Sequence, residues 1–154
     1  MNIFVLHENP SIASTMHVDK HIVKMPLETA QLLCTVNWLL NNPAPYKATH
    51  KNHPCTIWAR QSIQNYLWLC DLGLELCKEY QFRYNKNHKC KDIIEWCIKN
   101  KPELPDNNLT MYALAMPDEF KVENDAVASY RNYYIGAKSH IHSWKNRETP
   151  YWIK

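Results

Sequence analysis

The segment HVDKHIVKMPLE, residues 17–28, places ionisable side chains at helical spacing. At about 100° per residue, His17, His21, Lys24 and Glu28 fall within roughly 60° of one another on a helix. Apolar residues flank this stripe on both sides, so we expect a helix that is buried nearly all round. Burying two imidazoles, an ammonium and a carboxylate is costly unless they pair or face a cleft. The segment therefore predicts either a cleft lined by these four side chains or a buried network in which they satisfy one another.

The composition favours one helical domain over residues 1–154. With 45% hydrophobic residues, the chain is long enough to bury one sizeable core. Gly73 and Gly136 are the only glycines, so glycine-rich phosphate loops and tight hairpin turns have almost no glycine to use. These features indicate a mainly α, compact, single-domain protein.

Caps, prolines and apolar periodicity predict the individual helices. Asn9 followed by Pro10 predicts a short first helix, and Asp19 is a candidate cap for the long striped helix. Pro26 is expected to kink that helix. Three further helices are expected from about Pro54 to Tyr84, from about Lys91 to Asn100, and from near Asn124 into the C-terminal region.

The six cysteines form no CxxC pair and show no zinc-ligand spacing. We expect them to be reduced residues of the core, because a disulfide framework is unusual in an intracellular domain of this hydrophobic content. The N-terminus lacks a basic lead-in and has too short an apolar run for a signal peptide, and no later segment has the length of a membrane span. These features predict a cytoplasmic protein without a membrane partner.

The net charge of +3 is distributed unevenly, with basic ends and an acidic middle. Near the C-terminus, Arg131, Tyr134, Lys138, His142 and Lys145 recur at spacings of three or four residues. Aromatic rings beside cations can stack on bases and neutralise phosphates. A packed helix with tyrosines in the core and basic ends in water has the same pattern. The stripe therefore predicts either a nucleic-acid surface or an ordinary core helix.

Five motifs carry a resemblance to known phage proteins. They read HxDKHxVKM from residue 17, THKNHP from 49, MPDEFK from 116, YRNYY from 130 and WKNRxxPxW from 144. The chain resembles a family of small phage proteins and, more distantly, the phage pyrimidine-dimer DNA glycosylases of the endonuclease V type. The resemblance implies a small all-α enzyme that flips a nucleotide out of the duplex and cleaves DNA through an imine, in the cytoplasm of a virus-infected host cell.

The chain departs from that family at both catalytic positions. His17 and Pro26 match a family histidine and proline at the same separation, but the family glutamate two residues before the proline is Lys24 here. The family nucleophile is the amine of a small residue exposed when the initiator methionine is removed, whereas Asn2 favours retention of Met1. A desolvated Lys24 or the Met1 amine is therefore the candidate nucleophile.

Glu28 lies one turn beyond Lys24 and is the candidate proton shuttle, with His17 or His21 as a second acid or base. Damaged or abasic duplex DNA is the expected partner, and no cofactor is expected. The candidate DNA-binding residues are His50, Lys51, His53, Arg60, Arg131, Tyr134, Lys138 and Lys145.

Two other functions fit the same residues. A cationic, aromatic pocket also suits a non-catalytic protein that sequesters a signalling nucleotide. A metal-dependent hydrolase could use the pairs His17/His21 and His50/His53 together with Asp19. The chain has no HExxH motif, and Lys24 on the same face opposes a cation, so we expect no metal.

Overall fold

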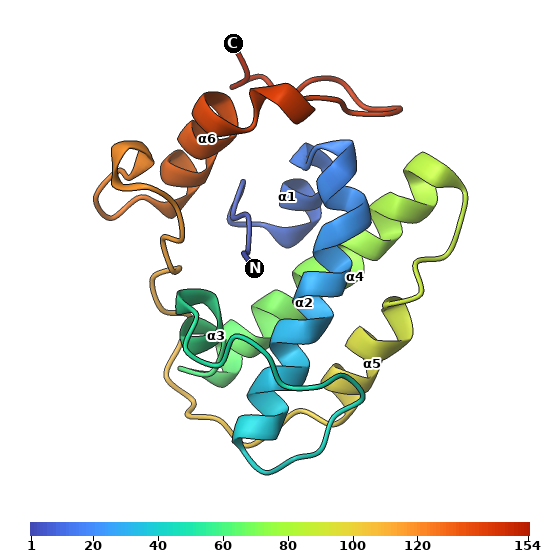
Figure 1. Ribbon diagram of the computed structural model, residues 1–154, viewed down its shortest axis with the longest axis vertical. Helices are drawn as coiled ribbons and strands as arrows, with labels where there is room; N and C mark the ends of the chain where they lie inside the picture. The colour runs from blue at the N-terminus through green and yellow to red at the C-terminus, as the bar shows by residue number, and fades with distance from the viewer.

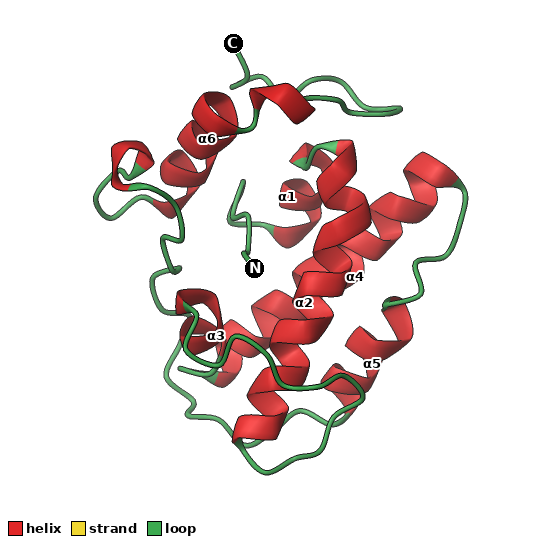
Figure 2. Cartoon of the chain, viewed as in Figure 1, coloured by secondary structure: helices red, strands yellow, loops and turns green.

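The protein consists of helices and connecting loops and contains no strand (Figure 2). The computed structural model describes residues 1–154. The helices are α1 (Pro10–Met16), α2 (Asp19–Leu39), α3 (Pro54–Ala59), α4 (Ile63–Tyr84), α5 (Lys91–Lys99) and α6 (Ala126–Ala137), with single 3-10 turns at Asp118–Phe120 and Ser139–Ile141. The prediction of a mainly α fold is confirmed.

Helix α2 forms the centre of the fold and packs against α3, α4 and α5 (Figure 1). It continues through Pro26, and from Met25 to Asn37 nearly every side chain is buried. The prediction of a helix buried nearly all round is confirmed for this part. In the first turns, Lys20, Val23 and Lys24 are exposed. This end of α2 therefore meets solvent on one side.

The start of α2 differs from the prediction. Val18 is extended and precedes the helix, which begins at Asp19, while His17 is the residue at the C-terminal end of α1. Asp19 caps no helix, because its carboxylate accepts hydrogen bonds from Arg83 and from the C-terminal segment. The predictions of one helical stripe beginning at His17 and of an Asp19 cap are wrong, since the extended Val18 interrupts the periodicity.

The expected long helix over residues 54–84 is divided into α3 and α4. The hydroxyl of Ser62 accepts a hydrogen bond from the backbone N–H of Asn65 at 3.1 Å. An extended serine is a favoured N-cap, so a new helix begins at Ile63. The prediction of one continuous helix is wrong because the apolar periodicity continues across this break in the backbone.

The outer helices were predicted with unequal success. The first short helix and the helix from Lys91 are confirmed as α1 and α5. Helix α6 begins after Asp125, which caps it, and ends before Lys138. His142 and Lys145 lie beyond the helix, so the prediction of one helical stripe reaching them is wrong. The spacing of three or four residues continues there without helical backbone.

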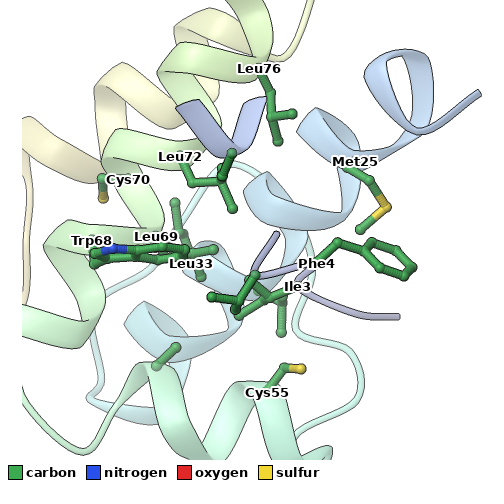
Figure 3. Packing of buried hydrophobic residues seen from close by; sticks show 14 of the residues in the cluster. Ile3, Phe4, Met25, Leu33, Cys55, Trp68, Leu69, Cys70, Leu72 and Leu76 are labelled. Carbon is green, nitrogen blue, oxygen red and sulfur yellow. The ribbon is translucent and has the colours of Figure 1, made fainter. Parts of the chain in front are cut away.

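The N-terminal segment, residues 1–6, lies between α2 and α6 (Figure 1). Its Ile3 and Phe4 side chains enter the core beside Met25 and Leu33 of α2, as Figure 3 shows. The six cysteines are all free and buried, which confirms the prediction of reduced core residues. None of the helices has both the length and the apolar character that a membrane crossing requires. The core thus holds the chain terminus inside the fold.

Candidate active site at the N-terminus

The N-terminal amine lies against a carboxylate of α2. The Met1 nitrogen is 3.5 Å from Oε1 of Glu28, and the backbone N–H of Asn2 donates to the same oxygen at 3.0 Å. The other oxygen, Oε2, lies 3.7 Å from Nζ of Lys24. One carboxylate therefore contacts two amino groups and one backbone N–H.

Burial makes this pairing necessary. Glu28 is buried, and a buried carboxylate without partners costs several kcal/mol, on the order of the penalties measured when a buried ion pair is broken. The Met1 side chain is only 4% exposed, although the residue as a whole is half-buried. The accessible part of Met1 is therefore its main chain, to which the amine belongs.

The side chain of Asn2 fixes the direction in which the chain enters the site. Its Nδ2 donates to the carbonyl of Ala115 at 2.9 Å, and its Oδ1 accepts hydrogen bonds from the backbone of Ile3 at 2.7 Å and from the hydroxyl of Tyr130 at 3.3 Å. These partners come from the N-terminal segment, the loop before α6 and α6 itself. The amine is thus held in place although it belongs to no helix.

Lys24 is accessible to solvent. Its side chain is 70% exposed and contacts Glu28 from the outside of the protein. The expectation of a desolvated Lys24 is wrong, because α2 turns this side chain outward and the neighbouring Val23 is exposed as well. The structure thus leaves an exposed lysine at the edge of the site.

His17 belongs to the core rather than to a cleft. Burial lowers its pKa to about 4, although its Nδ1 donates to the carbonyl of Ala13 at 2.7 Å. Its Nε2 is buried and has no hydrogen-bond partner. Because the side chain is fully buried, the acid or base role expected of His17 has no support in this geometry.

His21 is also held by packing. Its ring stacks on Phe4 with centroids 4.3 Å apart, and its Nδ1 is 2.6 Å from the hydroxyl of Tyr134. Burial, followed by the charges of His17, Lys138 and Lys24, lowers its pKa to about 3. A group with this pKa stays neutral near pH 7 and is a weak general base there. The role of acid or base expected of His21 has no support in this geometry.

The loop after α2 lies near the Met1 amine. Burial lowers the pKa of His53, and the positive charges of the Met1 amine and His50 lower it further. His50 and Lys51 are exposed beside His53, and Nη1 of Arg60 donates to the Lys51 carbonyl at 2.7 Å. Of these loop residues, His53 is half-buried and lies near the amine, whereas His50 and Lys51 are exposed.

The C-terminal candidates do not form one surface stripe. Arg131 donates to the Leu6 carbonyl at 3.0 Å and to the Tyr151 hydroxyl at 3.1 Å, and Nζ of Lys138 lies 5.0 Å from the centre of the Tyr133 ring. Lys145 lies over Tyr84 of α4 instead.

Of the two interpretations of Tyr134, a ring that stacks on DNA and a tyrosine of the core, this structure favours the second. The residue is fully buried, and its hydroxyl contacts His21 and the backbone N–H of Val18. The side of α6 that carries Tyr134 faces α2 and the N-terminal segment, so no base can reach this ring.

A hollow of about 500 Å³ lies beside Lys24. Apolar side chains of α2, an aromatic ring, an amide and basic groups surround it, which suits a base together with its phosphate. Its lining residues are Val23, Lys24, Leu27, Tyr80, Asn87, His88 and Lys89.

The candidate residues predicted from the sequence do not include those that the segment after α4 contributes to this hollow. The order Asn-His-x-Cys occurs twice, at residues 52–55 and 87–90, and this repeat was the available signal. In both copies the backbone N–H of the cysteine donates to Nδ1 of the histidine at 3.1 Å. The second copy also places Nε2 of His88 2.9 Å from the Val23 carbonyl, which closes one side of the hollow.

No three His, Cys, Asp or Glu side chains come together to form a possible metal site. Of the residues considered for a hydrolase, His17 is buried and Asp19 is paired with Arg83.

Comparison with known proteins identifies the family. The family model described as pyrimidine dimer DNA glycosylase matches residues 1–92, which span α1 to α4 and include the amine, Lys24 and Glu28. No curated protein and no solved structure matches the chain. The match covers more than half of the chain and agrees with the all-helical fold. The protein therefore belongs to the pyrimidine dimer DNA glycosylase family, with a repair function of the DNA glycosylase type.

Proposed function

We propose that the protein is a DNA glycosylase with abasic-site lyase activity whose nucleophile is the Met1 amine. The observation that carries this proposal is the contact of 3.5 Å between that amine and Oε1 of Glu28. A nucleophile beside a general base is the arrangement that covalent catalysis requires. The family match supports the same class of chemistry.

An α-amino group suits this role better than an exposed lysine. In peptides it loses its proton at about pH 7.7–8.0, against about 10.4 for a lysine side chain, so more of it is neutral near pH 7. The Lys24 side chain is 70% exposed and contacts Glu28 from the solvent side. In our proposal Lys24 instead contacts a phosphate or holds Glu28.

The proposed reaction begins when the neutral amine attacks C1′ of the damaged nucleotide. The bond from C1′ to the base breaks, and the base leaves with the bonding electrons and takes a proton from water. Glu28 accepts a proton from the attacking nitrogen and returns one to O4′ as the sugar ring opens, which leaves an imine. Removal of a proton from C2′ then expels the 3′ phosphate, and water releases the sugar from the amine.

The hollow beside Lys24 supports the binding step. Enzymes that act on a base extrude the nucleotide into a pocket, and a hollow of about 500 Å³ has room for one. In our proposal Lys24 and Lys89 contact the phosphates of the bound strand. The cations further out, which contact the flanking phosphates, are His50, Lys51, Arg60, Arg131, Lys138 and Lys145.

Borohydride trapping tests this proposal. Incubation with abasic DNA or with dimer-containing DNA should yield a covalent complex, and peptide mapping by mass spectrometry should place the adduct on the N-terminal peptide. Lys24→Ala should still be trapped. An adduct on the Lys24 peptide would make that lysine the nucleophile. If no complex forms and the protein instead binds a free nucleotide with no affinity for duplex, the catalytic proposal is overturned.

A further inference from the structure

One corner of the hollow beside Lys24 contains a histidine ring held in a fixed orientation. Asn85 ends α4 in the left-handed conformation, with φ at 54°, and the chain then returns toward α2. In the returning segment, Nδ1 of His88 accepts a hydrogen bond from the N–H of Cys90 at 3.1 Å. Nε2 therefore carries the proton and donates it to the Val23 carbonyl at 2.9 Å. Both ring nitrogens are thus engaged, which fixes the plane of the His88 ring.

Tyr80 of α4 supplies a second ring at the same corner. Its ring centre lies 4.8 Å from that of His88, with the two ring planes 75° apart, and 5.2 Å from that of Tyr84. The Tyr80 side chain is half-buried, and both Tyr80 and His88 line the hollow. Aromatic rings prefer to meet face to face with an offset or edge to face. A flat ligand in this corner can therefore stack on one ring while its edge meets the other.

The hollow is connected to the proposed nucleophile through one pair of side chains. Lys24 lines the hollow, and its Nζ is 3.7 Å from Oε2 of Glu28. The other oxygen of that carboxylate is 3.5 Å from the Met1 nitrogen. Lys24 thus lies between the hollow and the carboxylate that contacts the amine, so a base in the hollow belongs to a nucleotide whose sugar is near these groups.

We propose that the corner formed by Tyr80 and His88 is the subsite for the base of the attacked nucleotide, and that this base stacks on Tyr80. The inference rests on the proposed function, which places a nucleotide in the hollow but assigns no side chain to its base. Stacking on an aromatic ring tolerates any base, because every base has a π-face. His88 keeps the Tyr80 ring in place. The subsite therefore acts on DNA that still carries the base and has nothing to hold at an abasic site.

The test compares two substrates in single-turnover borohydride trapping of Tyr80→Ala. Dimer-containing DNA carries the base, whereas abasic DNA lacks it, and both are used at protein concentrations below saturation. We expect the trapping rate with dimer-containing DNA to fall by about 5-fold to 10²-fold more than the rate with abasic DNA. This range corresponds to the loss of one stacking contact between a base and an aromatic side chain.

Two further variants separate stacking from a general loss of structure. Tyr80→Phe keeps the ring and should retain the preference of the wild type for dimer-containing DNA. Phe82→Ala is the matched control, because it removes a ring from the same helix that is 51% exposed and lies against the Arg147 guanidinium instead of lining the hollow. It should change neither rate. Circular dichroism and urea unfolding check that each variant is folded.

The outcomes distinguish this inference from the proposed function. If the wild-type protein is trapped with both substrates and Tyr80→Ala changes both rates equally or not at all, the stacking role is overturned and the proposed function stands. A selective loss of the same size in Phe82→Ala also counts against it. If the wild-type protein is trapped with abasic DNA alone, the lyase activity stands and the base subsite is overturned. If it is trapped with neither substrate, the proposed function fails, and this inference fails with it.

Discussion

The family resemblance implies a carboxylate at position 24. In this protein Glu28 supplies the carboxylate that lies beside the amine. Position 24 carries a lysine, and the carboxylate approaches from one turn further along α2. Because residues four apart lie on the same side of a helix, both side chains reach the same corner. The protein thus keeps a carboxylate, Glu28, beside the amine, and Lys24 adds an amino group on the solvent side of that carboxylate.

Glu28→Gln should slow imine formation by about 10²-fold or more, because an amide cannot accept the proton of the attacking amine. The substitution keeps the size of the side chain and an oxygen that can accept the N–H of Asn2. Single-turnover trapping measures the rate, and a titration with abasic duplex measures affinity, which should change little. An unchanged trapping rate would remove Glu28 from the mechanism.

Tyr134→Phe should lower the free energy of unfolding by about 1–3 kcal/mol, because Nδ1 of His21 and the N–H of Val18 lose a buried partner. The neighbouring Tyr133 is the control, since it is only half-buried and its hydroxyl makes no hydrogen bond within the protein. Tyr133→Phe should change stability by less than about 0.5 kcal/mol. Urea unfolding measures both, and equal effects would contradict the structural role assigned to the Tyr134 hydroxyl.

Among the elements, α4 anchors the C-terminal segment to the rest of the fold. Its Arg83 is fully buried and donates to Glu79, to Asp19 and to the carbonyls of Thr15 and His17. The C-terminal segment adds a second guanidinium to the Glu79 carboxylate, at 2.9 Å through two nitrogens. A buried charge of this kind remains stable only because every partner is present.

Acid should weaken this connection. Burial alone raises the pKa of Glu79, but hydrogen bonds from Arg147 and Arg83 outweigh it, so the pKa lies below its usual value; the pKa of Asp19 is lowered in a similar way. A carboxyl group whose pKa is lowered by folding stabilises the protein above its unfolded pKa, and this contribution is lost as the pH falls through its folded pKa.

We therefore expect the free energy of unfolding to decrease below about pH 4.5 and less steeply in Glu79→Gln than in the wild type. Urea unfolding at a series of pH values measures this dependence. Asp118→Asn is the control, because that side chain is 95% exposed and its ion pair with Lys121 is open to solvent screening. Parallel curves for wild type and Glu79→Gln would contradict the assignment.

On the scale of the whole molecule, the candidate site depends on both ends of the chain. The family match ends at residue 92, but Asn2 is anchored to Ala115 and Tyr130, which lie beyond it. A single cluster of buried hydrophobic residues also includes side chains from the N-terminal segment to Trp152. The C-terminal part therefore helps to hold the amine against α2.

From this arrangement we predict that residues 1–154 unfold as one domain. The calorimetric and van't Hoff enthalpies should agree, and far-ultraviolet circular dichroism and tryptophan fluorescence should report the same midpoint. Two separate transitions, one of them confined to the C-terminal part, would show that the site is shared between two units.

The binding of DNA should depend steeply on salt, because it releases counterions from each phosphate that is neutralised. Lys138→Ala should reduce the slope of log affinity against log salt by about one, the change expected for one lost phosphate contact. Lys138→Arg keeps the charge and should preserve the slope. Binding that does not respond to salt would contradict a DNA interface formed by these cations.

The sequence by itself determined the fold class, α1, α5 and the buried face of α2. These features depend on local periodicity, caps and the near absence of glycine, all of which act between neighbours in the chain. Local periodicity also led to errors at Val18 and Ser62, where the apolar pattern continues but the backbone does not remain helical.

Only the tertiary structure decided which ionisable groups meet. The stripe from His17 to Glu28 looked continuous, yet the fold buries His17, exposes Lys24 and gives Glu28 the amine of Met1 as its partner. This contact joins residues far apart in the sequence, and the core that packs Ile3 against α2 creates it. Burial and long-range pairing determine the free energy of each charged side chain in the fold. A local sequence pattern predicts neither of them.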